Sequence, residues 1–328
     1  MIRAGVVGTG AMGQHHVRIL SQLENVELVG IADVNTSVLR ALAKKYSTTP
    51  YTDYRELLFR NELDAVTVAV PTTLHKDVAL AAIHSGASVL VEKPIADSVE
   101  AATEMIAAAR EAGVRLMVGH IERFNPAIVA LKHIVDRGEI GKVVSMSAKR
   151  VGPHNPRIRD VGIILDLGVH DIDVMQYLYG ERIRRVFASA GKVLHPHEDY
   201  SSMLLKFSNG YSGIIETNWL TPHKVRELTV VGTEGIAYVD YLKSTLKIYD
   251  DHWIKEAKVE RREPLLNELT HFIECIESGR RPIVSGEDGR HVLEVALAAI
   301  RSYRAGSVVD IPPYGAELKL AGMIEVPG

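Results

Sequence analysis

The chain has 328 residues, of which 46% are hydrophobic and 24% are charged, a balance typical of a globular protein with two domains of ordinary size. Its formal net charge of −3 argues against broad electrostatic binding to nucleic acid or to an anionic membrane surface, so we expect neither partner. A single cysteine, Cys275, excludes an intrachain disulfide, and the lack of a signal peptide or a membrane-length apolar stretch predicts a cytoplasmic protein.

Up to residue 119, short apolar runs alternate with helical patterns, which predicts βαβ units and a mostly parallel sheet. The expected strands are Ile2–Val7, Val26–Ala32, Ala65–Val70, Ser88–Val91 and Arg115–Val118. The expected helices are Gln14–Gln22, Thr36–Tyr46, Tyr54–Arg60, Lys76–Ser85 and Val99–Ala112. We therefore interpret residues 1–119 as an α/β domain built on a doubly wound parallel sheet.

A glycine-rich loop follows the first strand of this domain. It reads Gly8-Thr9-Gly10-Ala11-Met12-Gly13, and an acid, Asp33, closes the next apolar run about 20 residues later. Gly8 allows a sharp turn, Gly10 lets the backbone approach a pyrophosphate, and Gly13 lets helix and strand pack closely. Strand, helix and acid in this order form the dinucleotide fingerprint of a Rossmann domain, whereas a glycine turn in a nucleotide-free protein would leave Asp33 unexplained.

Asp33 also indicates which dinucleotide binds. A carboxylate accepts a hydrogen bond from the ribose 2′-hydroxyl and repels a 2′-phosphate, so we expect NAD rather than NADP, with Val34 beside Asp33 in the same site. Polar residues that follow two later strands are expected to complete the cofactor site at the nicotinamide end, because open parallel sheets bind ligands at the carboxyl ends of their strands. These residues are Pro71, Thr72, His75, Glu92 and Lys93. For Lys93, a solvated lysine at a strand end is the alternative.

The pattern changes after residue 119, and we assign residues 120–328 to a second domain. Asn125-Pro126 opens a helix that runs to Gly138, with further helices near Ile164–Tyr179, Asn267–Glu277 and Gly289–Tyr303. Alternating apolar residues and the Asn209-Gly210 turn predict an α+β domain with a large, open, mostly antiparallel sheet. Its expected strands are Val143–Val151, Ile183–Ala190, Ser201–Phe207, Tyr211–Asn218, Arg226–Val231, Ile236–Tyr241 and Thr245–Tyr249.

One predicted helix of the second domain carries an acid and a histidine four residues apart. Asp166 and His170 should therefore share a helix face. His170 has the intrinsic pKa to take a hydroxyl proton near neutrality, and a carboxylate one turn away can orient its ring. The alternative for this pair is an ordinary contact on a helix surface.

The glycine fingerprint, Glu92-Lys93-Pro94 and the stretch from Leu165 to Asp173 together resemble the glucose–fructose oxidoreductase, inositol dehydrogenase and rhizopine catabolism (Gfo/Idh/MocA) family over essentially the whole chain. The resemblance implies an oxidoreductase whose catalytic set is Lys93, Asp166 and His170. It also implies a homodimer or homotetramer formed through the sheet, to which we assign Met203, Leu205, Phe207 and Ile214. Asp160-Val161-Gly162 departs from the glycines that many members carry ahead of this helix.

The substrate is expected to be a sugar or a nucleotide sugar. Residues 118–126 resemble the subgroup that oxidises the 3-hydroxyl of UDP-N-acetylglucosamine to the 3-keto sugar. Basic residues that could hold a diphosphate are Lys149, Arg150, His154, Arg157 and Arg159. We predict that Arg123, Asn125, Lys149 and Arg157 bind substrate.

Other readings of these residues stay open. Asn125 can be only a helix cap, and the basic loop only a solvated face. A free polyol or monosaccharide of the inositol or glucose type is the rival substrate, and a non-catalytic cofactor-binding regulator is the rival from another class. His195-Pro196-His197-Glu198-Asp199 has metal-ligand residue types but lies in an expected loop without cysteine, so no metal site is predicted.

Overall fold

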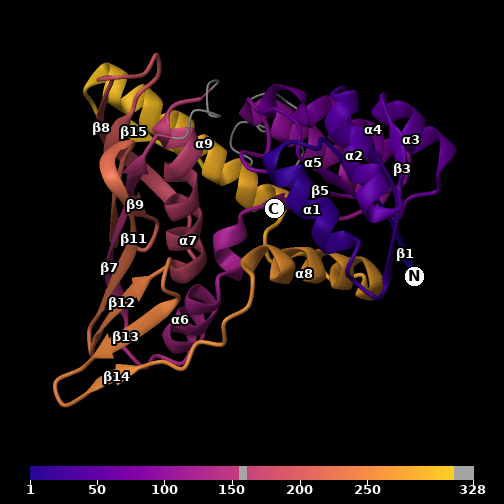
Figure 1. The fold of residues 1–328 in the computed structure, drawn as a ribbon. Coiled ribbons are helices and arrows are strands. Elements are labelled where there is room, and N and C mark those ends of the chain that lie inside the picture. Colours follow the sequence, from indigo (N-terminus) through magenta and orange to yellow (C-terminus); the bar gives the residue numbers. More distant parts are fainter. Residues whose placement is uncertain (155–160, 314–328) are drawn as a thin grey trace, which may run out of the picture. The chain divides into compact units, whose positions relative to one another are not determined.

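A computed structural model describes residues 1–154 and 161–313 of the chain. The chain forms two compact units, Met1–Pro126 with Glu260–Leu293, and Ala127–Val259 with the described residues from Glu294 onward. The segment from Glu260 to Leu293 had been expected in the second domain, but it folds with the first unit. The reason is its packing, because helix α8 (Pro264–Ser278) contacts α1 (Ala11–Leu20) and η2 (Ile121–Phe124). Figure 1 shows the helices and strands of both units as a ribbon.

The first unit contains a six-stranded sheet in the order β3-β2-β1-β4-β5-β6, and every neighbouring pair of strands is parallel. Its strands are β1 Ile2–Val7, β2 Val26–Ala32, β3 Thr49–Tyr51, β4 Ala65–Val68, β5 Ser88–Glu92 and β6 Leu116–Gly119. Its other helices are α2 Thr36–Tyr46, α3 Tyr54–Arg60, η1 Thr72–Leu74, α4 His75–His84 and α5 Val99–Ala112. This confirms the doubly wound α/β domain and adds β3, which Pro50 disguises in the sequence.

The strand order of this sheet determines where a ligand can bind. The chain proceeds from β1 outward to β2 and β3, then crosses back so that β4 pairs with the other side of β1. The carboxyl ends of β1 and β4 therefore form the switch point at which open parallel sheets hold their ligands. Asn35 caps the start of α2 by accepting from the Val38 N–H, and Ser98 caps α5 by accepting from the Ala101 N–H.

The second unit contains a nine-stranded sheet in the order β14-β13-β12-β11-β7-β10-β9-β8-β15. Its strands are β7 Val143–Pro153, β8 Ile183–Gly191, β9 Tyr200–Phe207, β10 Ser212–Asn218, β11 Leu220–Gly232, β12 Ile236–Asp240, β13 Thr245–Tyr249, β14 Ile254–Glu256 and β15 Val309–Asp310. The pair β10 and β7 is parallel and every other pair is antiparallel, so the sheet is mostly antiparallel as predicted. Gly210, with φ of 88°, makes the turn between β9 and β10.

The two faces of this sheet differ in what covers them. Helices α6 (Pro126–Asp136) and α7 (Val169–Tyr179) lie against one face, as Figure 1 shows. Met203, Leu205 and Phe207 are buried on the covered side, so our assignment of these three to an oligomer contact is wrong. The opposite face carries exposed apolar residues that lie directly across from one another on adjacent strands, namely Phe187, Leu204 and Ile214.

The segment with Asp166 is not the ordinary helix that was predicted over Ile164–Tyr179. Residues Ile164–Gly168 form a π-helical turn, η3, and the α-helix α7 begins at Val169. Such wide turns within helices occur often at functional sites.

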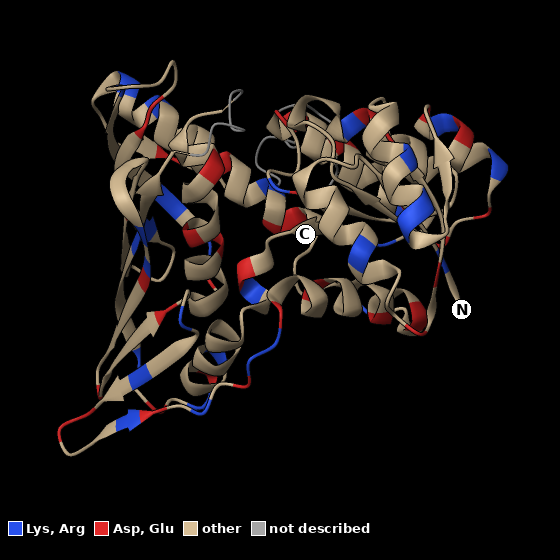
Figure 2. Ribbon diagram, viewed as in Figure 1, with Lys and Arg blue, Asp and Glu red and all other residues tan. Residues whose placement is uncertain are grey.

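Basic and acidic residues are interspersed along the ribbon of both units, as Figure 2 shows. Among residues 1–154 and 161–313, no helix has the length and the apolar character that a membrane span requires.

Candidate functional site

The glycine loop between β1 and α1 has the geometry of a nucleotide cradle. Gly8 has φ of +93°, and a Cβ there would lie 2.4 Å from the Ala69 carbonyl oxygen. A Cβ on Gly13 would lie 1.8 Å from the Gly8 carbonyl oxygen, so helix and loop approach too closely for any side chain. A Cβ on Gly10 would meet no described atom within 4 Å. The sequence thus keeps open space at the N-cap of α1, where a pyrophosphate would approach the helix start.

Asp33, at the end of β2, is held by this loop. One carboxylate oxygen accepts from the Thr9 N–H at 2.5 Å and from the Thr9 hydroxyl at 2.9 Å, and the other accepts from the Asn35 N–H at 2.7 Å. The side chain is half-buried and lines a cavity. These donors fix the carboxylate while leaving it the acceptor sites that a ribose hydroxyl needs.

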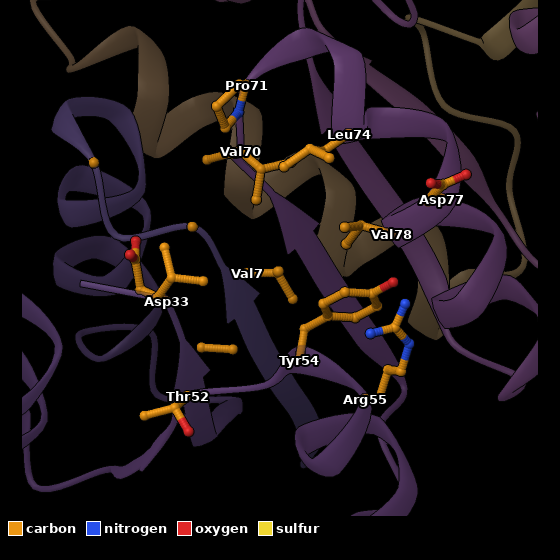
Figure 3. A pocket seen from close by; sticks show the side chains of 15 residues that line it. Val7, Asp33, Thr52, Tyr54, Arg55, Val70, Pro71, Leu74, Asp77 and Val78 are labelled. Atoms are coloured by element: carbon orange, nitrogen blue, oxygen red, sulfur yellow. The ribbon is translucent and has the colours of Figure 1, made fainter. Parts of the chain in front are cut away.

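The cavity at the carboxyl ends of β1, β2 and β4 has a volume of about 430 Å³. Figure 3 shows Asp33 on one side, the residues Val70, Pro71 and Leu74 on a second, and Tyr54 with Arg55 on a third. Of the predicted cofactor residues, the following line it: Gly8, Gly10, Asp33, Val34 and Pro71. Glycine cradle, fixed carboxylate and adjoining cavity together fit NAD.

Several cavity residues were missed by the sequence analysis. They are Thr52, Tyr54, Arg55, Leu74, Asp77 and Val78. Three of them follow β3, the short strand that the apolar pattern does not reveal, so its carboxyl end was not considered. The remaining three belong to η1 and the first turn of α4, where a signal did exist, because these residues follow β4 at the same sheet edge.

A second group of predicted residues surrounds the end of β5. Glu92 and His16 form a buried pair, with Glu92 Oε1 3.0 Å from His16 Nε2. Burial raises the pKa of Glu92, but the hydrogen bond to His16 and the charges of His16, Lys93 and His75 outweigh it, so the pKa lies below its usual value. Lys93 follows directly and is half-buried. His75 is buried between the carbonyls of Val70 and Pro94.

The second unit carries Asp166 and His170, both half-buried, on η3 and the first turn of α7. The backbone leads from Gly162, whose carbonyl accepts from the Asp166 N–H at 3.0 Å. Next to His170, Asp171 is buried against Arg150 of β7 in a two-bond ion pair. Arg150 therefore neutralises a carboxylate of its own unit and does not serve as the free diphosphate ligand that was considered for it.

The predicted substrate-binding residues are spread over both units. Arg123 is buried in the first unit, where its Nη1 donates to the Ile283 carbonyl at 2.6 Å. Asn125 is also buried and donates to Glu122 Oε2 at 3.2 Å. Lys149 lies in the second unit, half-exposed, 3.5 Å from Glu216 Oε2. Arg157 lies outside the described residues.

The histidine-rich loop after β8 is held by hydrogen bonds to the side chain of Asp199. The Asp199 carboxylate accepts from the N–H groups of Val193, Leu194 and His195. The His195 ring lies 3.6 Å from that of His154, centroid to centroid. In the part of the chain that the structure describes, no group of three or more His, Cys, Asp or Glu residues is placed to hold a metal ion.

The chain matches two protein-family models and is similar to several known proteins. Residues 2–120 match a model described as the oxidoreductase family, NAD-binding Rossmann fold, and residues 128–238 match the GFO/IDH/MocA C-terminal domain. The chain is 30% identical over 335 residues to scyllo-inositol 2-dehydrogenase (NAD(+)) of Bacillus subtilis, covering 94% of this chain and 96% of the relative.

It is 28% identical over 306 residues to UDP-N-acetylglucosamine 3-dehydrogenase of Acidithiobacillus ferrooxidans, covering 90% of this chain and 95% of the relative. A solved structure of that enzyme superposes with a TM-score of 0.87, covering 93% of this chain and 98% of the other.

Proposed function

This chain belongs to the GFO/IDH/MocA oxidoreductase family and contains its NAD-binding Rossmann domain, and on that premise we propose that it oxidises the 3-hydroxyl of UDP-N-acetylglucosamine to the 3-keto sugar. The coarser activity, that of an NAD-binding oxidoreductase acting on sugar or polyol hydroxyls, is what its relatives share. The observation that carries the finer proposal is the similarity to a UDP-N-acetylglucosamine 3-dehydrogenase in sequence and in fold over at least 90% of this chain.

In this proposal His170 acts as the general base that takes the proton of the reacting hydroxyl. Asp166 orients the His170 ring and stabilises its charged form. The Lys93 ammonium donates a hydrogen bond to the same substrate oxygen as it becomes a carbonyl. The glycine loop and Asp33 would hold NAD, which would supply the acceptor for the hydride of the carbon that bears the hydroxyl. The chain's own contribution is thus to position the sugar and to receive one proton on His170.

The rival substrate is a free polyol such as an inositol. One relation favours it, because the identity to scyllo-inositol 2-dehydrogenase is 30%, slightly above the 28% identity to the nucleotide-sugar enzyme. One structural observation does so too, since Arg150 is committed to Asp171 and Arg123 is buried. A diphosphate ligand from the basic segment would then have to come from His154, Arg157, Arg159 or Lys149, of which Lys149 is half-exposed.

The experiment is a substrate screen in the presence of NAD, in which the formation of NADH is measured by its absorbance. UDP-N-acetylglucosamine should give a kcat/KM far above that of scyllo-inositol, myo-inositol and glucose, and UDP-glucose serves as the control for the acetamido group. Because remote binding energy is used to position the reacting carbon, free N-acetylglucosamine should lose kcat as well as affinity. Turnover of inositols alone would overturn the proposal. Binding of NAD without turnover of any of these compounds would favour a regulator.

A further inference from the structure

His75 occupies an unusual position at the edge of the first unit's sheet. It is the first residue of α4, and its side chain is 1% exposed. Its Nδ1 lies 2.9 Å from the Pro94 carbonyl oxygen, and its Nε2 lies 3.0 Å from the Val70 carbonyl oxygen. Both partners are backbone oxygens, which only accept hydrogen bonds. One imidazole ring therefore connects the chain segment after β4 to the chain segment after β5.

The segment after β5 is held from a second side as well. Glu92, the last residue of β5, contacts the buried His16 of α1 through a 3.0 Å bond between Oε1 and Nε2. Lys93 thus lies between two residues that buried histidines hold, Glu92 through its side chain and Pro94 through its carbonyl. The Lys93 N–H also points toward the Glu92 carboxylate, at 3.3 Å from Oε2.

This arrangement points to a role different from the one that the sequence suggested for His75. Both ring nitrogens face protein oxygens, so the ring is engaged inside the unit and does not line the NAD cavity. A neutral ring can donate to one of the two carbonyls at a time, and a protonated ring can donate to both. The neutral ring leaves its unprotonated nitrogen facing the other carbonyl without a hydrogen bond. Because His75 itself belongs to the segment after β4, donation to the Pro94 carbonyl alone still joins that segment to the one after β5. A buried carbonyl that loses its donor is left with a desolvation cost.

We propose that His75 is a positioning residue, which fixes the Lys93 segment by donating a hydrogen bond from the start of α4 to the carbonyl of Pro94. The importance of this for turnover rests on the proposed function, in which Lys93 contacts the reacting oxygen. The structural part of the proposal does not rest on it. The ring contacts backbone carbonyls and does not line the NAD cavity, so it acts through the backbone next to the lysine.

The first test needs no substrate. Brief acetylation with acetic anhydride, read by peptide mass spectrometry, measures how accessible the Lys93 amine is relative to the exposed Lys44. In H75L, which removes the ring N–H, the relative labelling of Lys93 should rise about tenfold, the population change expected for losing one ordinary hydrogen bond. In H75Q, whose amide keeps two N–H donors, it should stay near the wild-type value. H84Q, at the exposed last residue of the same helix, is the matched control.

Each outcome of this test decides the proposal. Unchanged Lys93 labelling in H75L overturns it. Equal increases in H75L and H75Q also overturn it, because a ring that acts only by packing would give that pattern. If H75L fails to fold, proton NMR of the wild type decides instead: an exchange-protected ring N–H that is present in H84Q and missing from H75Q supports the link. The absence of such a signal overturns it.

The second test applies the assay for UDP-N-acetylglucosamine oxidation. H75L should lose kcat by about tenfold to a hundredfold, the cost of a small misplacement of a reacting group, while KM for NAD stays within about twofold. H75Q should recover most of the loss. An absence of turnover in the wild type would count against the proposed function and leave the Lys93 labelling result intact. A kcat that is unchanged in H75L, in an active enzyme, would overturn the positioning role.

Discussion

Arg150 and Asp171 form a fully buried ion pair that attaches the first turn of α7 to β7. Arg150 Nε lies 2.8 Å from Asp171 Oδ2, Arg150 Nη2 lies 3.0 Å from Oδ1, and both side chains are 1% exposed. Removal of one partner leaves the other charge buried without compensation. We therefore expect D171N to lower the free energy of unfolding by about 3–5 kcal/mol, measured by urea denaturation.

The chain offers a matched control on the same strand. Lys149 and Glu216 lie 3.5 Å apart with both side chains about half exposed, so E216Q should change the free energy of unfolding by less than about 1 kcal/mol. A D171N variant no less stable than E216Q would show that the buried pair is dispensable. Because Asp171 adjoins His170, D171N should also lower kcat, through the orientation of α7.

Asp33 should set the preference for NAD over NADP. Its carboxylate would repel a 2′-phosphate, so the ratio of kcat/KM for the two cofactors should favour NAD in the wild type and move toward unity in D33S. D33S should also weaken the binding of NAD, because the Asp33 carboxylate accepts hydrogen bonds from the Thr9 N–H and hydroxyl and so positions the glycine loop. D64S is the control, since Asp64 accepts from the Arg3 N–H and does not line the cavity. A wild-type preference for NADP would remove Asp33 from this role.

The proposed catalytic residues should separate turnover from cofactor binding. H170A and K93A are each expected to lower kcat by about 10² to 10⁴ with an unchanged Kd for NAD, measured by titration calorimetry. D166N should be as severe or milder, because it impairs the orientation of His170 without removing the base. The exposed His223 provides a control in H223A. Near-native kcat in H170A would refute the assignment of the base.

The open face of the second unit's sheet should be covered by a second copy of the chain. Phe187 pairs directly with Leu204 and Leu204 with Ile214, and these three side chains are 41%, 49% and 51% exposed. Exposed apolar side chains in register across three strands mark an interaction surface. We expect L204E to shift the mass measured by light scattering toward the 36.1 kDa monomer. M203L is the control, because Met203 is adjacent in sequence but buried, and this change should leave the mass unchanged. A wild-type protein that is monomeric would refute the expectation.

Acid pH should destabilise the first unit through His75. Burial lowers the pKa of His75, and the carbonyls of Pro94 and Val70 and the charge of Glu92 offset this only in part. The unfolded chain therefore binds this proton more readily than the native chain, so the free energy of unfolding should fall as the pH drops below the ordinary histidine pKa of 6.5. H75Q should show a shallower fall between neutrality and that region. An identical slope in both proteins would contradict this.

The pKa of Glu92 lies below its usual value of 4.5, so this carboxylate adds a separate loss of stability at more acid pH. Its stabilising contribution is complete above that value and disappears as the pH falls through the lowered pKa of the native state. E92Q, followed by urea denaturation, should remove this second component and keep the one that comes from His75.

Local patterns were sufficient to predict five of the six strands of the first unit's sheet. Glycine spacing, apolar runs and the acid after β2 are properties of neighbouring residues, and the structure places Gly8, Gly10 and Asp33 together at one cavity. The π-helical turn at Asp166 could not be predicted, because it differs from an α-helix in backbone pairing rather than in residue pattern. β3 was missed since a three-residue strand is too short to show alternation.

The burial of charged residues was the second feature that could not be predicted from the sequence. Arg123 lies in the stretch that resembles the nucleotide-sugar subgroup and Arg150 in the basic segment, so both were candidate ligands, yet each is buried against a partner distant in sequence. Only tertiary contacts distinguish an arginine that binds a ligand from one that pairs with a group inside its own fold. The same holds for Met203, Leu205 and Phe207, since alternation separates the two faces of a strand but does not tell which face the helices cover.

The membership of Glu260–Leu293 in the first unit has a consequence for synthesis of the chain. Phe124 receives a hydrogen bond from Asn267, and Arg123 donates to Ile283, so η2 is completed by residues made more than a hundred positions later. Domains ordinarily fold in order as they leave the ribosome. Here η2 lacks its hydrogen bonds to Asn267 and Ile283 until the whole of Ala127–Val259 has been translated. A stop codon placed in that interval would release an N-terminal fragment that lacks part of its own unit.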